Sequence, residues 1–207
     1  MSGRKTHYNK SVSLVELLIA SALIVLIAVG FTSIDIFSRH HVLNAERRVK
    51  MQNELAYALE TVNKAVARGV VDLAYPPGDP AHSPLVLLAD GFQVKVDNDS
   101  TSTPWDFTSI NFTLKPAPSG NDNYLKYQVG AEPEETLASH ILPGVNFGSL
   151  PSPPTKPTNG LYVKLLNNGT MIEIALVARW KPNEAESIDN PQVSMKSIIS
   201  ARSSAIN

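Results

Sequence analysis

A single carboxylate stands in the most apolar stretch of the chain, KSVSLVELLIASALIVLIAVGF, which covers residues 10–31. Glu16 is the one charged residue between Ser11 and Phe31. An ionised carboxylate at the centre of a membrane helix costs roughly 2.5 to 3.5 kcal/mol, and less near the helix end, so such a group usually has a partner. The chemistry that this residue indicates is therefore compensation of a charge, with Glu16 pairing to a cation.

Residue types used in catalysis or metal binding do not occur at the spacings that such chemistry needs. The sequence has no phosphate-binding glycine loop, no GxSxG, no HExxH and no cysteine. Two adjacent histidines, His40 and His41, would point about 100° apart on a helix, whereas His82 and His140 stand alone in the sequence. The segment DNDST, residues 97–101, contains two aspartates but lacks the glycine and the distal glutamate of an EF-hand calcium loop. We therefore expect no enzyme, no cofactor and no metal site.

The apolar run, residues 12–31, is long enough to cross a membrane. As a helix, its 20 residues rise about 30 Å, which is the thickness of the hydrocarbon core. Arg4, Lys5 and Lys10 precede the run and no acidic residue does, so the positive-inside rule places residues 1–11 in the cytoplasm. The rest of the chain is then expected to be exported.

Two other interpretations of this run remain open. In a cleaved secretory signal, the small residues Ala20, Ser21 and Ala22 would form the cleavage site. Glu16 would then interrupt a very short apolar core, and the stretch LIVLIAVGF would continue the hydrophobic run beyond the cut. In a plain signal anchor, a carboxylate near the cytoplasmic end is tolerated, but Glu16 has no role there.

The segment SVSLVELLIASALIVLIAV, preceded by a short basic leader, resembles the amino terminus of type IV pilins and of the pseudopilins of type II secretion. Precursors of that family carry a small residue, the cleavage point, an apolar residue and a glutamate at the fifth mature position. Here these positions correspond to Ser11, Val12 and Glu16. Ser11 stands where the family normally has glycine, and Val12 replaces the usual phenylalanine.

The resemblance implies a processing step followed by assembly. A membrane aspartyl peptidase, the prepilin peptidase, would cut between Ser11 and Val12, and the new amino terminus at Val12 would be methylated. With the inner-membrane assembly platform and other pilin or pseudopilin subunits, the chain would pack its helix into a filament. Glu16 would there face the amine of a neighbouring subunit, which compensates a charge that is otherwise stranded in an apolar bundle.

Beyond the apolar run, hydrophobic residues recur three and four positions apart, which predicts one stripe on an amphipathic helix. The stripe consists of Met51, Leu55, Ala58, Leu59, Val62, Ala65 and Val66. No proline occurs between Val12 and Gly69, so one helix of nearly 60 residues is allowed, with Gly30 as its softest point. Gly69 is its expected end.

Alternation of apolar and polar residues predicts strands in the rest of the chain. The expected strands are residues 85–89, 92–96, 108–115, 124–130 and 193–201, with two more in residues 161–180. These last two flank Asn167-Asn168-Gly169, a hairpin signal because Asn-Gly tolerates positive φ. Trp105 and Trp180 are expected to pack as core or edge aromatics.

The predicted fold class is α+β and pilin-like, with a long N-terminal helix packed on an antiparallel β-sheet. Residues 1–11 form the leader, 12–31 the transmembrane or filament-core segment, 32–69 the amphipathic continuation and 70–207 the globular β domain. In length and element order the chain is similar to the larger minor pilins and the J-type minor pseudopilins.

The expected function is that of a structural subunit, of the minor kind, of a type IV pilus or a type II secretion pseudopilus. The chain would cross the bacterial inner membrane once, with its N-terminus cytoplasmic and its C-terminal domain periplasmic, before it joins the pilus or pseudopilus. The alternative is a signal-anchored exported domain that binds a ligand as a monomer. A net charge of -1 gives no reason to expect nucleic acid as a partner.

Overall fold

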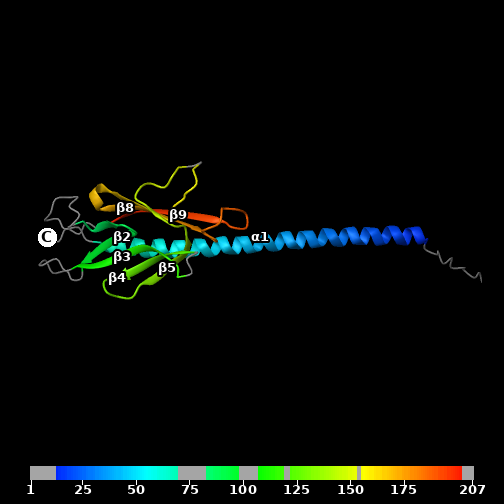
Figure 1. Ribbon diagram of the computed structural model, residues 1–207, viewed down its shortest axis with the longest axis horizontal. Helices are drawn as coiled ribbons and strands as arrows, with labels where there is room; N and C mark the ends of the chain where they lie inside the picture. Colours follow the sequence, from blue (N-terminus) through cyan, green and yellow to red (C-terminus); the bar gives the residue numbers. More distant parts are fainter. Residues whose placement is uncertain (1–12, 70–82, 98–106, 119–121, 153–154, 202–207) are drawn as a thin grey trace, which may run out of the picture. The chain divides into compact units, whose positions relative to one another are not determined.

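The computed structural model describes residues 13–69, 83–97, 107–118, 122–152 and 155–201. Within them the chain forms one long helix, α1, and a sheet of nine strands (Figure 1). The fold is α+β, as predicted. Contacts between residues divide the chain into two units, Met1–Leu43 and Asn44–Asn207. The strands are β1 (Leu85–Leu88), β2 (Gly91–Asp97), β3 (Phe107–Pro116), β4 (Asn123–Val129), β5 (Glu135–Ile141), β6 (Val145–Asn146), β7 (Leu161–Leu166), β8 (Met171–Arg179) and β9 (Gln192–Ser200).

Helix α1 extends from Leu14 to Arg68 and has 55 residues. It passes through Gly30 as one helix, because a single glycine without a proline weakens a helix but does not end it. At the other end, Gly69 N–H donates to the Val66 carbonyl at 2.9 Å, and Gly69 forms a bridge with Val96 of β2. The predicted long helix and its predicted end are both confirmed.

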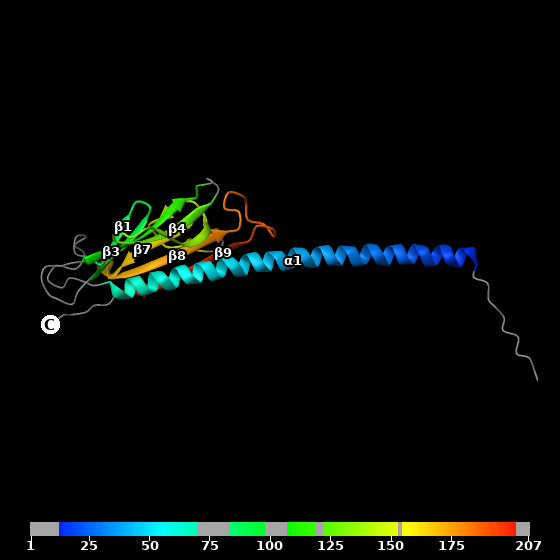
Figure 2. The ribbon, with the colours of Figure 1, turned by 90° about the horizontal axis from the view of Figure 1, so that it is seen from below.

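In the second unit, α1 lies along one face of the sheet (Figure 2). The residues of the predicted stripe are all buried: Met51, Leu55, Ala58, Leu59, Val62, Ala65 and Val66. Full burial of an aliphatic side chain stabilises a fold by about 1.5 to 3 kcal/mol, so the stripe is the main attachment of the helix to the strands. Across from it, the rings of Phe92 and Phe112 stack with their centroids 4.9 Å apart in the same core.

The sheet has the strand order β1-β2-β3-β4-β5-β8-β7-β6, with β9 also paired to β8. All pairs are antiparallel except β6 with β7, which is parallel. Strand β9 occupies one edge of β8 along its nine residues, so β7 and the end of β5 must share the other edge. Strand β8 therefore joins the two parts of the sheet, and its residues from Ile172 to Ala178 are almost all buried.

Most strands were predicted and two were not. Alternation correctly placed β1 to β4 and β7 to β9, and the turn at Asn167–Gly169 has positive φ at all three residues. Strands β5 and β6 were missed. In β5, ETLASHI, the alternation is broken because the β4–β5 pairing shifts register twice, and β6 has only two residues.

Candidate functional site

The first turn of α1 holds Glu16 and explains how its carboxylate is accommodated within the chain. Ser13 N–H donates to Glu16 Oε2 at 3.0 Å, and Val15 N–H donates to Ser13 Oγ at 3.3 Å. The helix ladder starts at the same residue, since Leu17 N–H donates to the Ser13 carbonyl at 3.1 Å. This pattern is a variant of the capping box in which the Ser13 hydroxyl accepts from Val15, the second residue of the helix, and the two side chains satisfy backbone donors that the helix leaves free.

The position of Glu16 also suits its charge. The first turn of a helix carries a partial positive charge from its free N–H groups, so a carboxylate there is stabilised. The signal for this arrangement is present in the sequence, because Ser13-Leu14-Val15-Glu16 fits the pattern of a serine followed three residues later by a glutamate. Sequence reasoning had assigned Glu16 a partner on another subunit and had missed the partner in its own chain.

The two residues of the expected cleavage site, Ser11 and Val12, lie outside the described residues. The cap residue Ser13 follows Val12 directly in the sequence. The described helix begins at Leu14. The proposed cleavage at Ser11–Val12 and methylation at Val12 therefore stay predictions.

By length and composition, α1 is able to span a membrane. Its apolar 18-residue window near the N-terminus contains no buried residue. Large apolar side chains are exposed from Leu14, at 80%, to Leu43, at 49%. Exposure of this much apolar surface to water is unfavourable, and the segment is long and apolar enough to cross a membrane.

Hydrogen bonds connect the first part of α1 in the second unit to the strands and to the loop between β8 and β9. The Glu54 carboxylate accepts hydrogen bonds from Ser139 N–H at 3.0 Å and from Ser139 Oγ at 2.6 Å. About two turns earlier, Arg47 Nη1 donates to the Asp189 carbonyl at 2.9 Å. These contacts precede most of the buried stripe, so they hold the part of α1 that apolar packing holds least.

A cluster of rings and cations lies beside these contacts. Trp180 is half-buried and packs against the core, as predicted, and His140 stacks on it with ring centroids 4.7 Å apart. Arg47 and Lys50 approach the same indole at 5.3 and 5.6 Å from its centroid, within the range of cation–π attraction. Trp105 and His82, which sequence reasoning also considered, lie outside the described residues.

His140 owes its position to a bulge in β5. Between the pairs Asn123–Ile141 and Leu125–Ala138, β5 has one residue more than β4, and His140 adopts φ 57°. The ring Nδ1 is buried without a hydrogen bond, and Asp122 Oδ2 is 3.8 Å away. His140 is isolated in the sequence, but in the fold it contacts an aromatic ring and faces a carboxylate.

The described residues contain no group of three histidine or acidic side chains that could hold a metal ion.

On the exposed side of α1, a hydrogen bond and the charge of Lys64 lower the pKa of Glu60, and Glu60 raises the pKa of Lys64 in the same way. Water screens this pair, so it contributes little to stability. Among the described residues, the features that stand out are therefore the capped carboxylate of Glu16, the exposed apolar part of α1 and the hydrogen bonds that hold α1 on the sheet.

No protein-family model, curated protein or solved structure matches this chain.

Proposed function

We propose that this chain is a structural subunit, of the minor kind, of a type IV pilus or a type II secretion pseudopilus, assembled through α1. The observation that carries the proposal is one carboxylate, Glu16, in the first turn of a helix whose apolar side chains are exposed for about thirty residues. A lone anchor needs an apolar span of about 20 residues and no charge in it. A helix that packs with other helices gains from a charge that specifies its register.

In this proposal the chain's own residues prepare the assembly. Removal of residues 1–11 by the prepilin peptidase would leave an amine on Val12, one residue before the cap Ser13. Glu16 Oε2 accepts a hydrogen bond from Ser13 N–H in the single chain. In the filament, the positively charged amine of a neighbouring subunit would be a second partner of the Glu16 carboxylate. The carboxylate would then enter the apolar bundle as part of an ion pair.

The proposal also assigns a location. The subunit would span the bacterial inner membrane with its N-terminus in the cytoplasm and its β domain in the periplasm, and the assembly platform would move it into the filament. The length and composition of α1 support the membrane span. The hydrogen bonds of Glu54 and Arg47 hold α1 against the β domain. They support a role in which the β domain moves together with the helix during assembly.

Mass spectrometry of the protein isolated from its native membrane tests the proposal. The expected product starts at Val12, lacks residues 1–11 and carries an added methyl group on its amine. A chain with an intact N-terminus, or one cut after Ala22, would overturn the proposal. Loss of the cut in cells that lack the prepilin peptidase, with the β domain still folded, is the matched control.

One observation favours a second candidate, a signal-anchored exported domain that acts as a monomer. Because Ser13 already satisfies Glu16, a plain anchor no longer leaves the carboxylate without a role. The two candidates differ in the fate of the chain after export. A monomer would stay in the membrane when filaments are sheared from cells, whereas a subunit would be recovered with them.

A further inference from the structure

Strand β9 lies at an edge of the sheet. It pairs with β8 alone, whereas β8 also pairs with β7 and β5. Among the described strands, two others pair on one side only, and these are short, since β1 has four residues and β6 has two. At nine residues, β9 is the longest open edge in the described part of the chain.

Hydrogen bonds at the two ends of β9 show which of its main-chain groups face away from β8. Ala201 N–H donates to the Thr170 carbonyl at 2.8 Å, and Trp180 N–H donates to the Pro191 carbonyl at 3.2 Å. The register between these two bonds has no shift, so the odd-numbered residues of β9 bond to β8. The N–H and C=O groups of the even-numbered residues form the outer edge of β9, which consists of Gln192, Ser194, Lys196, Ile198 and Ser200.

Burial of the side chains shows that the outer edge of β9 is accessible from both faces of the sheet. On the outer face, the even-numbered residues from 194 to 200 are exposed, and Ile198 is 55% exposed. On the inner face, Ser197 Oγ donates to Asn63 Oδ1 of α1 at 3.3 Å, yet the odd-numbered residues from 195 to 199 are only half-buried. The described part of α1 therefore leaves room beside β9.

The features that normally protect an edge strand from pairing are missing in β9. Proteins protect such edges with prolines, with bulges or with lysines that point outward. Strand β9 contains no proline, and its continuous register excludes a bulge. Its one charged residue, Lys196, pairs with Glu173 of β8 across the face of the sheet. Nothing in the described part of β9 therefore opposes the addition of another strand.

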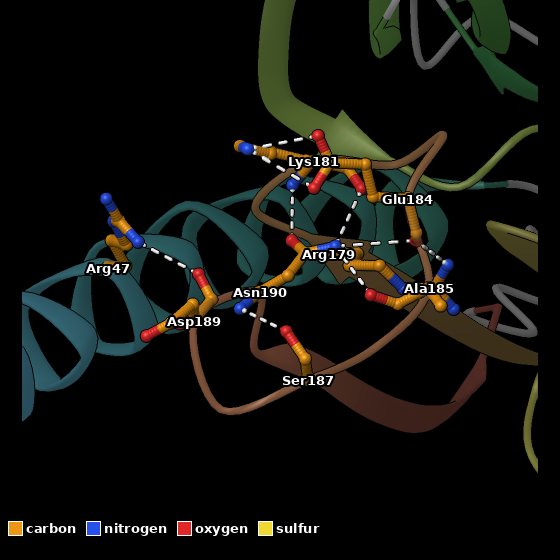
Figure 3. A network of polar contacts seen from close by, with 8 residues as sticks. All are labelled: Arg47, Arg179, Lys181, Glu184, Ala185, Ser187, Asp189 and Asn190. Atoms are coloured by element: carbon orange, nitrogen blue, oxygen red, sulfur yellow. Dashed lines mark hydrogen bonds and ion pairs between the residues drawn. The ribbon is translucent and has the colours of Figure 1, made fainter.

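The loop that joins β8 to β9 fixes the start of this strand (Figure 3). Asn190 is 2% exposed, and its Oδ1 accepts from Lys181 N–H at 2.7 Å. Its Nδ2 donates to the carbonyls of Lys181 and Ala185, both at 3.0 Å. At the first pair of the two strands, Arg179 Nε donates to Gln192 Oε1 at 3.1 Å. The edge is therefore already ordered, so little conformational entropy is lost when a strand binds to it.

We propose that the outer edge of β9 binds one extended segment of a different protein, which is added to the sheet as a further strand. Main-chain donors and acceptors that recur every second residue are matched by another extended backbone, and this mode of recognition is β-augmentation. The segment has no proline at the positions that face β9, because each of these positions donates an N–H. Opposite Ile198 it carries an apolar side chain, since such cross-strand pairs stabilise a sheet.

Charge disfavours a second copy of this chain as the occupant. If β9 paired antiparallel with the β9 of a second copy along its whole length, Lys196 at the centre would face the second copy's own Lys196. Like charges directly opposite one another destabilise a sheet, so the partner carries a neutral or acidic residue there. The edge belongs to the second unit alone, so the inference does not depend on the proposed function and applies equally to an anchored monomer.

Amide hydrogen exchange of the full chain in mild detergent, measured residue by residue, tests whether the edge is open. The amides of Ser194 and Ile198 should exchange about tenfold faster or more than those of Met195 and Ser197, because the latter two bond to β8. Equal protection of the two pairs would mean that the chain itself covers the edge, and would overturn the proposal.

Photocrosslinking in the cells that normally make this protein tests the occupant. The photoreactive amino acid benzoylphenylalanine replaces Ser194 in one full chain and Ile198 in another. Both are expected to attach to one segment of a single other protein, at sites about four residues apart, because two paired strands advance together. Attachment to the same chain or to a second copy, attachment at scattered sites, and absence of any attached protein each overturn the proposal.

A Ser194→Pro chain separates strand addition from other kinds of contact. Proline removes an N–H that points away from β8 and is tolerated at such edge positions, so this variant should unfold at the same temperature as Ser194→Ala. Crosslinking from position 198 should fall about tenfold or more with Ser194→Pro, and less than about twofold with Ser194→Ala, which keeps the N–H. Equal crosslinking in the two variants overturns the proposal. None of these measurements uses filaments, so their outcome is independent of the proposed function.

Discussion

The carboxylate of Glu54 on α1 accepts both hydrogen bonds that Ser139 of β5 can donate to it, from the backbone N–H at 3.0 Å and from Oγ at 2.6 Å. Ser139 belongs to the bulge in which β5 has one residue more than β4, and a bulge leaves a strand donor without its ladder partner. Glu54 supplies the missing acceptor. The helix and the irregular strand therefore stabilise each other.

The first prediction concerns this pair. Glu54→Ala should lower the free energy of unfolding by about 1 to 3 kcal/mol, because two half-buried donors of Ser139 lose their acceptor. Glu54→Gln keeps one acceptor oxygen and should lose less. Urea unfolding of the full chain in mild detergent measures both. Glu60→Ala, at an exposed position on the same helix, should stay within about 0.5 kcal/mol of the original, and a similar loss there would contradict the assignment.

The second prediction concerns the buried stripe. Leu55 is fully buried in the core between α1 and the sheet, so Leu55→Ala should leave a cavity and lower the free energy of unfolding by about 2 to 5 kcal/mol. Tyr57→Ala, two residues away on the exposed side of the helix, should have a much smaller effect. The same urea titration distinguishes the two, and equal losses would mean that the stripe is not the packed face.

The third prediction concerns independence of the second unit. A fragment that starts near Ser38 removes most of the exposed apolar helix but keeps the whole buried stripe and the contacts of Arg47 and Glu54. It should be soluble and folded, because each buried aliphatic side chain still contributes about 1.5 to 3 kcal/mol. Far-UV circular dichroism should show helix and strand together. Persistent aggregation would indicate that the stripe belongs to an interface between subunits.

The fourth prediction separates two roles of Glu16. Glutamine can replace glutamate in a capping box, so Glu16→Gln keeps the helix start but removes the charge, whereas Glu16→Ala removes both. If Glu16 pairs with a neighbour's amine, both variants should be cleaved normally and both should fail to enter filaments, because stranding the buried amine costs about 3 to 5 kcal/mol. Recovery in sheared filaments and the mass of the cleaved chain are the measurements.

The opposite result for Glu16→Gln would be equally clear. Normal incorporation of that variant, with poor incorporation of Glu16→Ala, would show that the cap is the role of the residue and would refute the pairing. Normal incorporation of both would remove any role in assembly. Either outcome would refute the pairing role of Glu16 alone, because a chain recovered with sheared filaments is still a subunit.

The fifth prediction concerns Ser11, where the resembling family has glycine. If the peptidase needs a small side chain before the cut, Ser11→Gly should leave the cut before Val12 and increase its rate. Leader removal followed over time on membranes that contain the peptidase measures this. Slower cutting, or a shifted product mass, would contradict the requirement for a small residue.

The capping box shows that a local feature can be present in the sequence and still be overlooked. Ser13 and Glu16 are three residues apart, and their spacing is sufficient to predict the contact that the structure contains. By contrast, the orphaned Nδ1 of His140 and its stacking on Trp180 have no such signal. They depend on a bulge that gives His140 a positive φ. Histidine is not one of the residues, such as glycine or asparagine, that normally mark such a conformation in a sequence.

By itself, the sequence determined the features that depend on order along the chain. The apolar run, the stripe of α1, seven of the described strands and the turn at Asn167–Gly169 all follow from periodicity or from the preferences of single residues. Only the tertiary structure decided which distant residues meet. Glu54 reaches Ser139 across 85 positions, and Arg47 reaches Asp189 across 142, because the sheet bends, bulges and brings β5 and the β8–β9 loop to the same side of the helix. Bends and bulges interrupt periodicity, so the contacts that they create leave no pattern in the sequence.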